Sequence, residues 1–266
     1  MESIQLLVCT QGEGIHRVPA MLLPPMPGVS YLISWQVPQV QQAEVPQALR
    51  GRDDVRVVCQ QGRGLARNRN HALTYASGDI LVLADDDCRY TAASLQLIRD
   101  AFAQAPHAHI IAFQAADTEG RPLRSYPAAP YRYPHLPRGA YVASVEMCMR
   151  RAATVLAFDE RFGLGAPYLC CGEEDVFLHQ AHGRGYVIEY VPQVMVQTPA
   201  GTTGTRFLTD AAVQRSKGAV LAMLYGFWGA LARCLWQVSV LRSCSLMQRF
   251  RILHHMWQGV RYIVSA

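Results

Sequence analysis

The chain has 266 residues, of which half are apolar and 17% are charged. This composition excludes an intrinsically disordered protein, and the length suffices for one large or two small domains with a buried core. The eight cysteines form no C-x-x-C pair and no regular framework, which indicates reduced thiols in a cytosolic protein. The N-terminus has no basic segment before its first apolar run, so we predict no signal peptide.

The net charge of +5 is concentrated near the C-terminus. Residues 205–266 carry eight arginine and lysine side chains and one acid, whereas residues 1–204 carry 17 basic and 19 acidic side chains. A basic, apolar tail beside a nearly neutral body indicates an anionic partner for the tail alone. We therefore predict a catalytic domain over residues 1–204 and a helical tail over residues 205–266.

Strands and helices alternate over roughly the first 115 residues. The predicted strands cover residues 4–10, 29–37, 55–59, 80–84 and 109–114, and the predicted helices cover residues 65–76 and 92–103. Thr91 is the expected N-cap of the second helix, and Leu95, Ile98 and Phe102 are spaced to face the sheet. This alternation predicts an α/β fold with a doubly wound, mostly parallel central sheet of the Rossmann-like type.

The alternation stops after residue 115. Residues 121–138 contain five prolines and predict an irregular excursion, which is either a binding loop or a plain surface loop. Tyr141–Met149 is predicted to be a strand, and a helix is expected to begin near Glu173 and end at His182. Two short strands, separated by Pro192, are predicted at residues 186–191 and 194–197.

Three consecutive carboxylates follow the strand that begins at Ile80. The apolar run before them predicts a strand buried on both faces, and ligands of open α/β sheets bind at the carboxyl ends of strands. Asp85, Asp86 and Asp87 repel one another and must meet water or cations. We expect a divalent cation that bridges Asp87 to a diphosphate, with Asp85 directed to the nucleoside or ribose; the alternative is a solvated acidic turn.

Two further segments carry charge at predicted helix starts. The glycine-rich lead into the helix with Arg67 favours anion binding, although a solvated polar helix face has the same pattern. Acids at Glu173, Glu174 and Asp175 complement a helix dipole by ~0.3–1 kcal/mol each. The dipole also keeps such a carboxylate ionised, as a general base must be to take a proton from a hydroxyl.

Five segments occur in an order and spacing that resemble family 2 glycosyltransferases. They are Ala66-Arg67-Asn68, Asp85-Asp86-Asp87, Phe158-Asp159-Glu160-Arg161-Phe162, Gly172-Glu173-Glu174-Asp175, and Gly185-Tyr186 followed by Val191-Pro192. The resemblance covers about residues 4–200. It implies a GT-A fold, a nucleotide-diphospho-sugar donor, Mg²⁺ or Mn²⁺, and transfer with inversion at the anomeric carbon.

The resemblance also implies a role for each matched residue. The donor would be bound by Thr10 and Gln11 at the end of the first strand, and by Arg67 and Asp85. Asp86 is assigned to the same donor site, where we expect its side chain to turn away into backbone hydrogen bonds or to support its neighbours. Asp87 would hold the metal ion. Asp175 would be the catalytic base that deprotonates an acceptor hydroxyl, with Glu174 beside it orienting the acceptor. Asp87 and Asp175 would then face one another across the sugar.

The chain departs from the family pattern at two places. Such enzymes commonly have an aspartate after the second strand to bind uracil, where this chain has Trp35-Gln36-Val37. Many also have a histidine near the position of Gln197, which this chain lacks. The resemblance therefore leaves the contacts to the base, and any further metal contact near Gln197, unassigned.

Residues 218–241 are apolar except for Arg233, Gln237 and Ser239. A membrane span needs ~20 mostly apolar residues, and an arginine near its centre costs ~2.5–3.5 kcal/mol. An amphipathic element in the plane of the membrane interface fits this pattern better, and a helix packed on the catalytic domain is the alternative. An interfacial tail predicts a peripheral enzyme on the cytoplasmic membrane surface, with a glycan or lipid-linked glycan acceptor.

Other functional classes explain fewer of these features. A sugar nucleotidyltransferase would need a glycine-rich phosphate loop after the first strand, and residues 10–17 are a poor version of one. A non-catalytic membrane-binding module of the same fold would explain the tail but neither acidic site. No nucleic-acid partner is expected. One lysine against 24 arginines indicates a GC-rich genome and, with the tail, bacterial surface-polysaccharide synthesis.

Overall fold

The structure, a computed structural model, describes residues 2–40, 43–137, 139–199 and 206–265. The chain forms two compact units, each described by itself. The first comprises Met1–Arg63, Arg67–Phe158 and Gln180–Ala200, and the second comprises Gly64–Ala66, Asp159–His179 and Gly201–Ala266. The predicted domain boundary between residues 204 and 205 lies outside the described residues.

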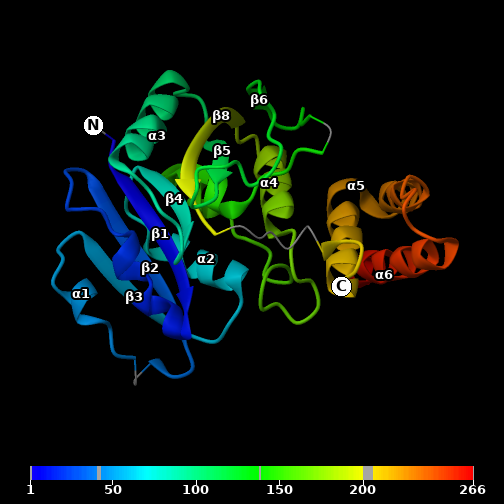
Figure 1. Cartoon of the computed structure of the whole chain (residues 1–266), viewed down its shortest axis with the longest axis horizontal. Coiled ribbons are helices and arrows are strands. Elements are labelled where there is room, and N and C mark those ends of the chain that lie inside the picture. Colours follow the sequence, from blue (N-terminus) through cyan, green and yellow to red (C-terminus); the bar gives the residue numbers. More distant parts are fainter. Residues whose placement is uncertain (1, 41–42, 138, 200–205, 266) are drawn as a thin grey trace. The chain divides into compact units, whose positions relative to one another are not determined.

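The first unit is built on an eight-stranded sheet with the order β3-β2-β1-β4-β7-β5-β8-β6 (Figure 1). Its strands are β1 (Ile4–Gln11), β2 (Val29–Val37), β3 (Val55–Gln61), β4 (Ile80–Asp85), β5 (Ile110–Ala116), β6 (Tyr131–Arg132), β7 (Met147–Arg150) and β8 (Ile188–Gln197). The pairs β1–β2, β1–β4, β2–β3 and β5–β8 are parallel, whereas β7 is antiparallel to β4 and β5, and β6 is antiparallel to β8. The predicted α/β fold with a mostly parallel sheet is confirmed.

Strand β4 lies in the interior of this sheet, between β1 and β7. The side chains of Ile80, Leu81, Val82 and Leu83 are all buried, so the strand is covered on both faces as its apolar run predicts. In the β1–β4 register Cys9 lies opposite Asp85. The carboxyl ends of β1 and β4 therefore meet at one edge of the sheet.

The described residues form six α-helices; those that begin at Leu65, Ala92 and Glu173 lie close to their predicted positions, whereas the short helix that begins at Gln47 was not predicted. The six helices are α1 (Gln47–Arg50), α2 (Leu65–Tyr75), α3 (Ala92–Gln104), α4 (Glu173–Gly183), α5 (Ala211–Ser239) and α6 (Leu246–Val264), with short 3-10 segments η1 (Gly12–His16), η2 (Val18–Met21), η4 (Ser144–Glu146) and η5 (Arg151–Val155). Thr91 caps α3 by accepting a hydrogen bond from the Ser94 backbone, as predicted. Leu95, Ile98 and Phe102 of that helix are fully buried.

The predicted strand at Tyr141–Met149 is wrong over its first two thirds, residues 141–146. Only β7, at Met147–Arg150, is a strand, and it follows the 3-10 turn η4. The buried carboxylate of Glu146 accounts for the difference. It accepts hydrogen bonds from the Ala143 backbone at 2.9 Å and the Tyr126 hydroxyl at 2.6 Å, and forms an ion pair with Arg124. These local bonds hold the backbone in a turn instead of a sheet ladder.

The two strands predicted on either side of Pro192 are one strand, β8. The β5–β8 register shifts between the pairs Ala112–Tyr190 and Gln114–Val194. Three residues of β8 thus oppose one residue of β5 in a bulge, and Pro192 lies within it. A bulge tolerates proline because the missing N–H removes no ladder hydrogen bond there.

The excursion between β5 and β7 is mostly irregular, as its prolines predict, but it is anchored. The guanidinium of Arg124 lies over the rings of Tyr126 and Tyr141, at 4.4 and 4.0 Å from their centroids. In β6 the ring of Tyr131 stacks on Tyr190 of β8 at 4.5 Å. That this excursion is a ligand-binding loop, and not a plain surface loop, stays a prediction.

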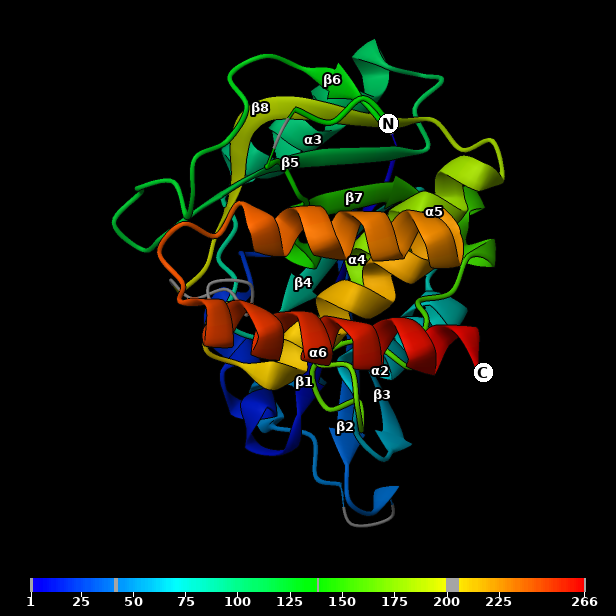
Figure 2. The same ribbon diagram turned by 90° about the vertical axis from the view of Figure 1, so that its right-hand side faces the viewer.

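Within the second unit, α5 and α6 lie side by side as a hairpin (Figure 2). A Cβ atom on Gly218 would stand 1.9 Å from the Met256 carbonyl oxygen, and one on Gly259 would stand 1.9 Å from that of Arg215. Only glycine permits this close crossing. Helix α5 is broken at Gly226, which has φ 66° and ψ 179°.

Among the described residues, α5 is the one helix long and apolar enough to cross a membrane. The break at Gly226 leaves two helical parts, residues 211–225 and 227–239. At ~1.5 Å per residue each part measures roughly 20 Å, less than the ~30 Å of a bilayer core.

Candidate active site

The buried carboxylate of Asp86, just after β4, accepts three hydrogen bonds from two side chains and lies close to a glycine. Asp86 accepts a 2.5 Å hydrogen bond from the Thr10 hydroxyl and bonds of 2.6 and 3.1 Å from the Arg17 guanidinium. A Cβ on Gly14 would stand 2.2 Å from an Asp86 carboxylate oxygen, so a glycine is required there. Asp86 therefore fixes the turn after β1 against the turn after β4.

Asp85 is half-buried at the C-terminus of β4 and has a buried cation beside it. The Arg69 guanidinium lies 3.6 Å from the Asp85 carboxylate, and the Arg69 side chain is only 2% exposed. Arg69 also donates to the Ser144 hydroxyl and lies over the Phe158 ring. A buried arginine held in this way stabilises the ionised form of the neighbouring carboxylate.

Asp87 is exposed, and it is the third member of the triplet. The hydroxyl of Thr198, one residue beyond β8, lies 3.4 Å from an Asp87 carboxylate oxygen. Arg89 and Gln197 exchange backbone hydrogen bonds of 2.7 and 3.0 Å, which hold the end of β8 beside the turn. Alternation along the chain thus buries Asp86 and leaves Asp85 and Asp87 accessible.

The donor atoms of this turn suit a hard divalent cation. Within the described ranges no three His, Cys, Asp or Glu side chains converge to form a complete metal cage. Mg²⁺ commonly uses one or two carboxylates and completes its shell with water and substrate phosphates. Exposed Asp87 and half-exposed Asp85 fit such an ion, whereas Asp86 has both oxygens engaged.

Asn68 connects the ends of three strands to α2. Its buried side chain accepts hydrogen bonds from the Ser34 hydroxyl at 2.6 Å and the Gln60 amide at 3.1 Å. It donates to the Thr10 carbonyl at 3.0 Å. Within the sequence Ala66-Arg67-Asn68, Asn68 therefore holds the strand ends together, whereas the neighbouring Arg67 is exposed.

A hollow of about 330 Å³ lies at the carboxyl ends of β1, β2 and β3. It is lined by Gln11, Gly12, Gln36, Val37, Pro38, Gln61, Gly62 and Arg63. The indole N–H of Trp35 donates to the Gly12 carbonyl at 2.8 Å and fixes the rim of the hollow. Arg67 lies against the backbone of Gly62, its guanidinium 3.0 Å from where a Cβ would stand. Amide side chains and a nearby cation suit a polar ring linked to phosphates.

The second acidic cluster opens α4. Glu173 is buried against Gly163, and Glu174 and Asp175, in the same first turn of the helix, are half-buried. Burial raises the pKa of Asp175, and Lys217 of α5 opposes that rise. From the helix dipole alone we predicted that a carboxylate at this helix start would stay ionised; the rise of the Asp175 pKa by burial was not part of that prediction. A base of raised pKa accepts a proton more readily than an ordinary aspartate.

Helix α5 packs directly on the approach to α4. The Ser216 hydroxyl accepts a 2.8 Å hydrogen bond from the Cys170 backbone, and Val220 fills the space beside Gly172, whose φ is +97°. Lys217 lies between these two contacts along the helix. It is the single lysine of the chain, and no sequence motif identified it.

The predicted residues thus divide between two places. Thr10, Gln11, Arg67 and the aspartate triplet lie in the first unit, at the carboxyl ends of its strands. Glu174 and Asp175 lie in the second unit, and their approach to Asp87 stays a prediction. Three further residues, Arg17, Arg69 and Thr198, were not predicted from the sequence; they contact the triplet from positions 16 to 111 residues away in the chain.

Comparison with protein families gives an independent result. Residues 41–154 match the family model described as glycosyl transferase family 2. No curated protein sequence matches the chain. The matched segment contains Arg67, Asn68 and the aspartate triplet, so the resemblance seen in the motifs is confirmed over this part of the chain.

Solved structures show the same fold. The crystal structure of S. aureus TarS 1–349 has a TM-score of 0.59 and 16% identity, covering 96% of this chain and 81% of that one. Its complex with UDP-GlcNAc has a TM-score of 0.57 and 16% identity, covering 97% and 81%. A longer S. aureus TarS structure has a TM-score of 0.57 and 17% identity, covering 97% and 49%. The chain therefore has the mostly parallel α/β architecture of GT-A glycosyltransferases.

Proposed function

We propose that this chain, matched over residues 41–154 by the family 2 glycosyltransferase model, is an inverting glycosyltransferase. It takes a sugar from a nucleotide-diphospho-sugar, in our proposal a UDP-sugar, and transfers it to a hydroxyl of a glycan or lipid-linked glycan. The observation that carries this proposal is the turn after β4, in which Asp86 is engaged inside the protein while Asp85 and Asp87 stay accessible.

The donor is proposed to lie along the carboxyl ends of β1 to β4. Its base occupies the hollow lined by Gln11, Gln36 and Gln61, in which the exposed amides of Gln11 and Gln61 can pair with the polar edge of a pyrimidine. Gln36 replaces the aspartate that the family commonly has near this position. Support for a uridine nucleotide comes from the similar fold of TarS, which was solved with UDP-GlcNAc and with UDP.

The diphosphate is proposed to lie between Arg67 and the aspartates. Arg67 offers a fork of N–H donors at its side of the hollow. Asp87, with Asp85 beside it, would hold Mg²⁺ or Mn²⁺. When bound, such an ion offsets the negative charge that builds on the leaving diphosphate. The Arg69 guanidinium, 3.6 Å from the Asp85 carboxylate, holds that side chain in place, and Asp85 is proposed to contact the ribose.

Asp175 is proposed as the general base for the acceptor. It removes the proton of the acceptor hydroxyl, whose oxygen attacks the anomeric carbon from the face opposite the diphosphate. Glu174 orients the acceptor beside it. The raised pKa of Asp175 supports this assignment, because the proton is taken up by a carboxylate that burial has made more basic.

Residues 205–266 are proposed to place the enzyme at the cytoplasmic face of the cell membrane, where a lipid-linked acceptor for surface polysaccharide would be found. The described part of this segment combines basic side chains with exposed apolar residues such as Trp228 and Phe250. An element of this kind binds an anionic interface.

A panel of UDP- and GDP-sugars tests the proposal. The purified protein is incubated with each donor and Mg²⁺, Mn²⁺ or EDTA, and the nucleoside diphosphate released as the sugar is transferred to water is measured. We expect metal-dependent release from at least one UDP-sugar. Release of inorganic pyrophosphate from a nucleoside triphosphate and a sugar phosphate would instead identify a nucleotidyltransferase.

A further inference from the structure

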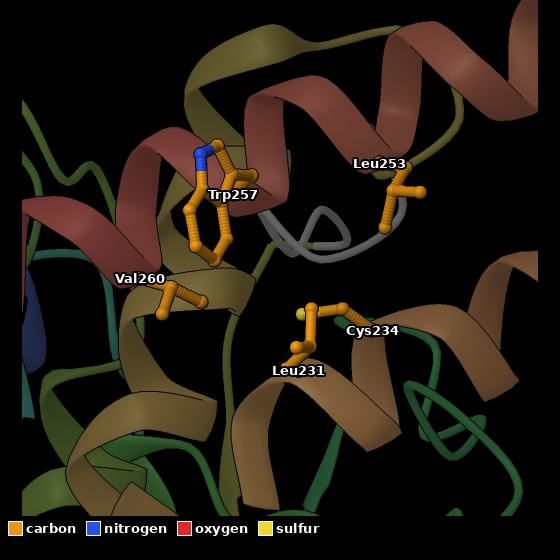
Figure 3. A pocket seen from close by; sticks show the side chains of 5 residues that line it. All are labelled: Leu231, Cys234, Leu253, Trp257 and Val260. Carbon is orange, nitrogen blue, oxygen red and sulfur yellow. The ribbon is translucent and has the colours of Figure 1, made fainter. Parts of the chain in front are cut away.

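The hairpin of α5 and α6 contains a pocket that the transfer reaction does not use. Leu231 and Cys234 of α5 face Leu253, Trp257 and Val260 of α6 across it (Figure 3). All five lining side chains are apolar, and the pocket has a volume of about 260 Å³. An apolar cavity of about 150 Å³ already admits a benzene-sized hydrocarbon, so this one has room for part of a hydrocarbon chain.

The part of the hairpin that forms this pocket also exposes large apolar side chains. Trp228, Leu235 and Trp236 follow at spacings that place them on one side of α5, and they are 77%, 50% and 54% exposed. At the start of α6, Leu246, Met247 and Phe250 are 73%, 80% and 69% exposed. Soluble proteins rarely expose such a set together, and tryptophan favours the boundary between water and lipid.

The break at Gly226 separates this end from the rest of α5. Before the break, Ala219 and Val220 pack with Phe162 and Val176 in the core of the second unit. After it, Ala230, Cys234 and Val238 pack with α6. The outer part of α5 therefore uses its inner side to form the hairpin and leaves its other side uncovered within the second unit.

The charged side chains of the hairpin are all basic. Residues 211–266 contain seven basic side chains and no aspartate or glutamate. Arg233, Arg242 and Arg251 are exposed, and the Arg233 guanidinium lies 3.5 Å from the centroid of the Tyr225 ring on the uncovered side. Apolar side chains surrounded by arginines complement a surface that is hydrocarbon inside and anionic outside.

We propose that the outer part of the hairpin docks on an anionic lipid leaflet and that the pocket between α5 and α6 takes one acyl chain of a lipid in that leaflet. Trp228, Trp236 and Phe250 enter the interface, and the exposed arginines contact lipid phosphates. This inference deepens the membrane association proposed above. Its test measures lipid binding alone, so its failure would leave the proposed transfer reaction standing.

Vesicle flotation tests the docking. The full-length protein is mixed with vesicles of phosphatidylcholine, with or without 30% phosphatidylglycerol, on the order of the charge of an anionic leaflet. We expect flotation only with phosphatidylglycerol. The variant Trp228→Ser with Trp236→Ser should lose about tenfold or more in partitioning, and Arg242→Gln with Arg251→Gln should reduce the dependence on phosphatidylglycerol.

Tryptophan quenching tests the pocket. In the variant Trp228→Phe with Trp236→Phe, the remaining indoles are Trp257 in the pocket and Trp35, which is buried in the first unit. Lipids brominated near the middle of the acyl chain should quench the Trp257 share of the emission, whereas lipids brominated at the headgroup should not. Leu231→Phe, which narrows the pocket, should reduce this quenching while flotation persists.

Three results would overturn the inference. One is flotation that does not depend on phosphatidylglycerol, or no flotation at all. Another is flotation without quenching of Trp257, which would leave the pocket without a lipid chain. The third is a dimer by analytical ultracentrifugation that Trp228→Ser with Trp236→Ser converts to a monomer, because a second copy of the chain would then cover this side. The exposed arginine variants remain informative if the serine variant fails to fold.

Discussion

The hydroxyl of Thr10 donates a 2.5 Å hydrogen bond to Asp86, although 76 residues separate them in the chain. This bond joins the ends of β1 and β4, which are neighbours in the sheet. Asp86 is engaged by it, and the residues on either side, Asp85 and Asp87, remain accessible. The geometry of the proposed donor site thus depends on the one aspartate of the three that faces inward.

Removing the Thr10 hydroxyl should weaken both the fold and the site. Thr10→Val conserves shape but leaves a buried oxygen of Asp86 without this donor, which costs about 1–3 kcal/mol of the free energy of unfolding. Thr10→Ser retains the hydroxyl and is the matched control. Urea unfolding measures the first effect and UDP titration the second. Equal stability of the valine and serine variants would show that the bond contributes nothing.

Asn68 should be a stability residue more than a binding residue. Its side chain joins Ser34, Gln60 and the Thr10 backbone, and Asn68→Ala leaves these buried groups short of partners. We expect a loss of about 3 kcal/mol in the free energy of unfolding. The neighbouring Arg67→Ala, at an exposed position, should change stability by less than about 0.5 kcal/mol and weaken donor binding instead. The opposite pattern would contradict these assignments.

Replacing Lys217 should shift the acidic limb of the pH–activity profile, the range in which activity falls as the pH drops. Burial raises the pKa of Asp175 and Lys217 lowers it, so activity should fall as pH drops through a pKa above the ordinary aspartate range. Lys217→Met removes the cation, raises that pKa further and shifts the limb to higher pH. Lys217→Arg should leave it in place. Profiles of kcat/KM against pH measure this, and superimposable limbs for Met and wild type would refute the coupling.

Asp175→Asn should abolish transfer while donor binding stays nearly intact. The amide fills the same space but cannot accept the acceptor's proton, and loss of a general base typically costs about 10²- to 10⁴-fold in rate. Glu174→Gln serves as the comparison, since its proposed role in orienting the acceptor predicts mainly a raised KM for the acceptor. Full transfer activity in the asparagine variant would remove Asp175 from the mechanism.

Local patterns predicted most of the first unit. Strand β4 could be recognised because its apolar run is continuous, and α3 because Thr91 and its buried face obey helix rules. The prediction failed at Tyr141 and Pro192, where a distant partner decides the conformation. Glu146 turns the chain through Arg124 and Tyr126, and β5 accepts Pro192 at a bulge.

The acidic residues of the candidate site could be predicted from the sequence, but the residues that hold them in place could not. Asp85 and Asp87 stand out because consecutive carboxylates after a buried strand need an explanation. Arg17, Arg69 and Thr198 carry no such signal, since an isolated arginine or threonine is usually a surface residue. Their contacts depend on the tertiary fold, which brings Arg17 from the turn after β1, Arg69 from α2 and Thr198 from the end of β8 to the same turn.

The effect of a divalent cation on nucleotide binding tests the central claim most directly. Isothermal titration calorimetry with UDP, with and without Mn²⁺, is run on the wild type and on Asp87→Asn. We expect Mn²⁺ to tighten UDP binding to the wild type by about tenfold or more, ~1.4 kcal/mol, and to have little effect on the variant. An equal effect of Mn²⁺ on both proteins, or no binding of UDP to the wild type, would contradict a donor site at the end of β4.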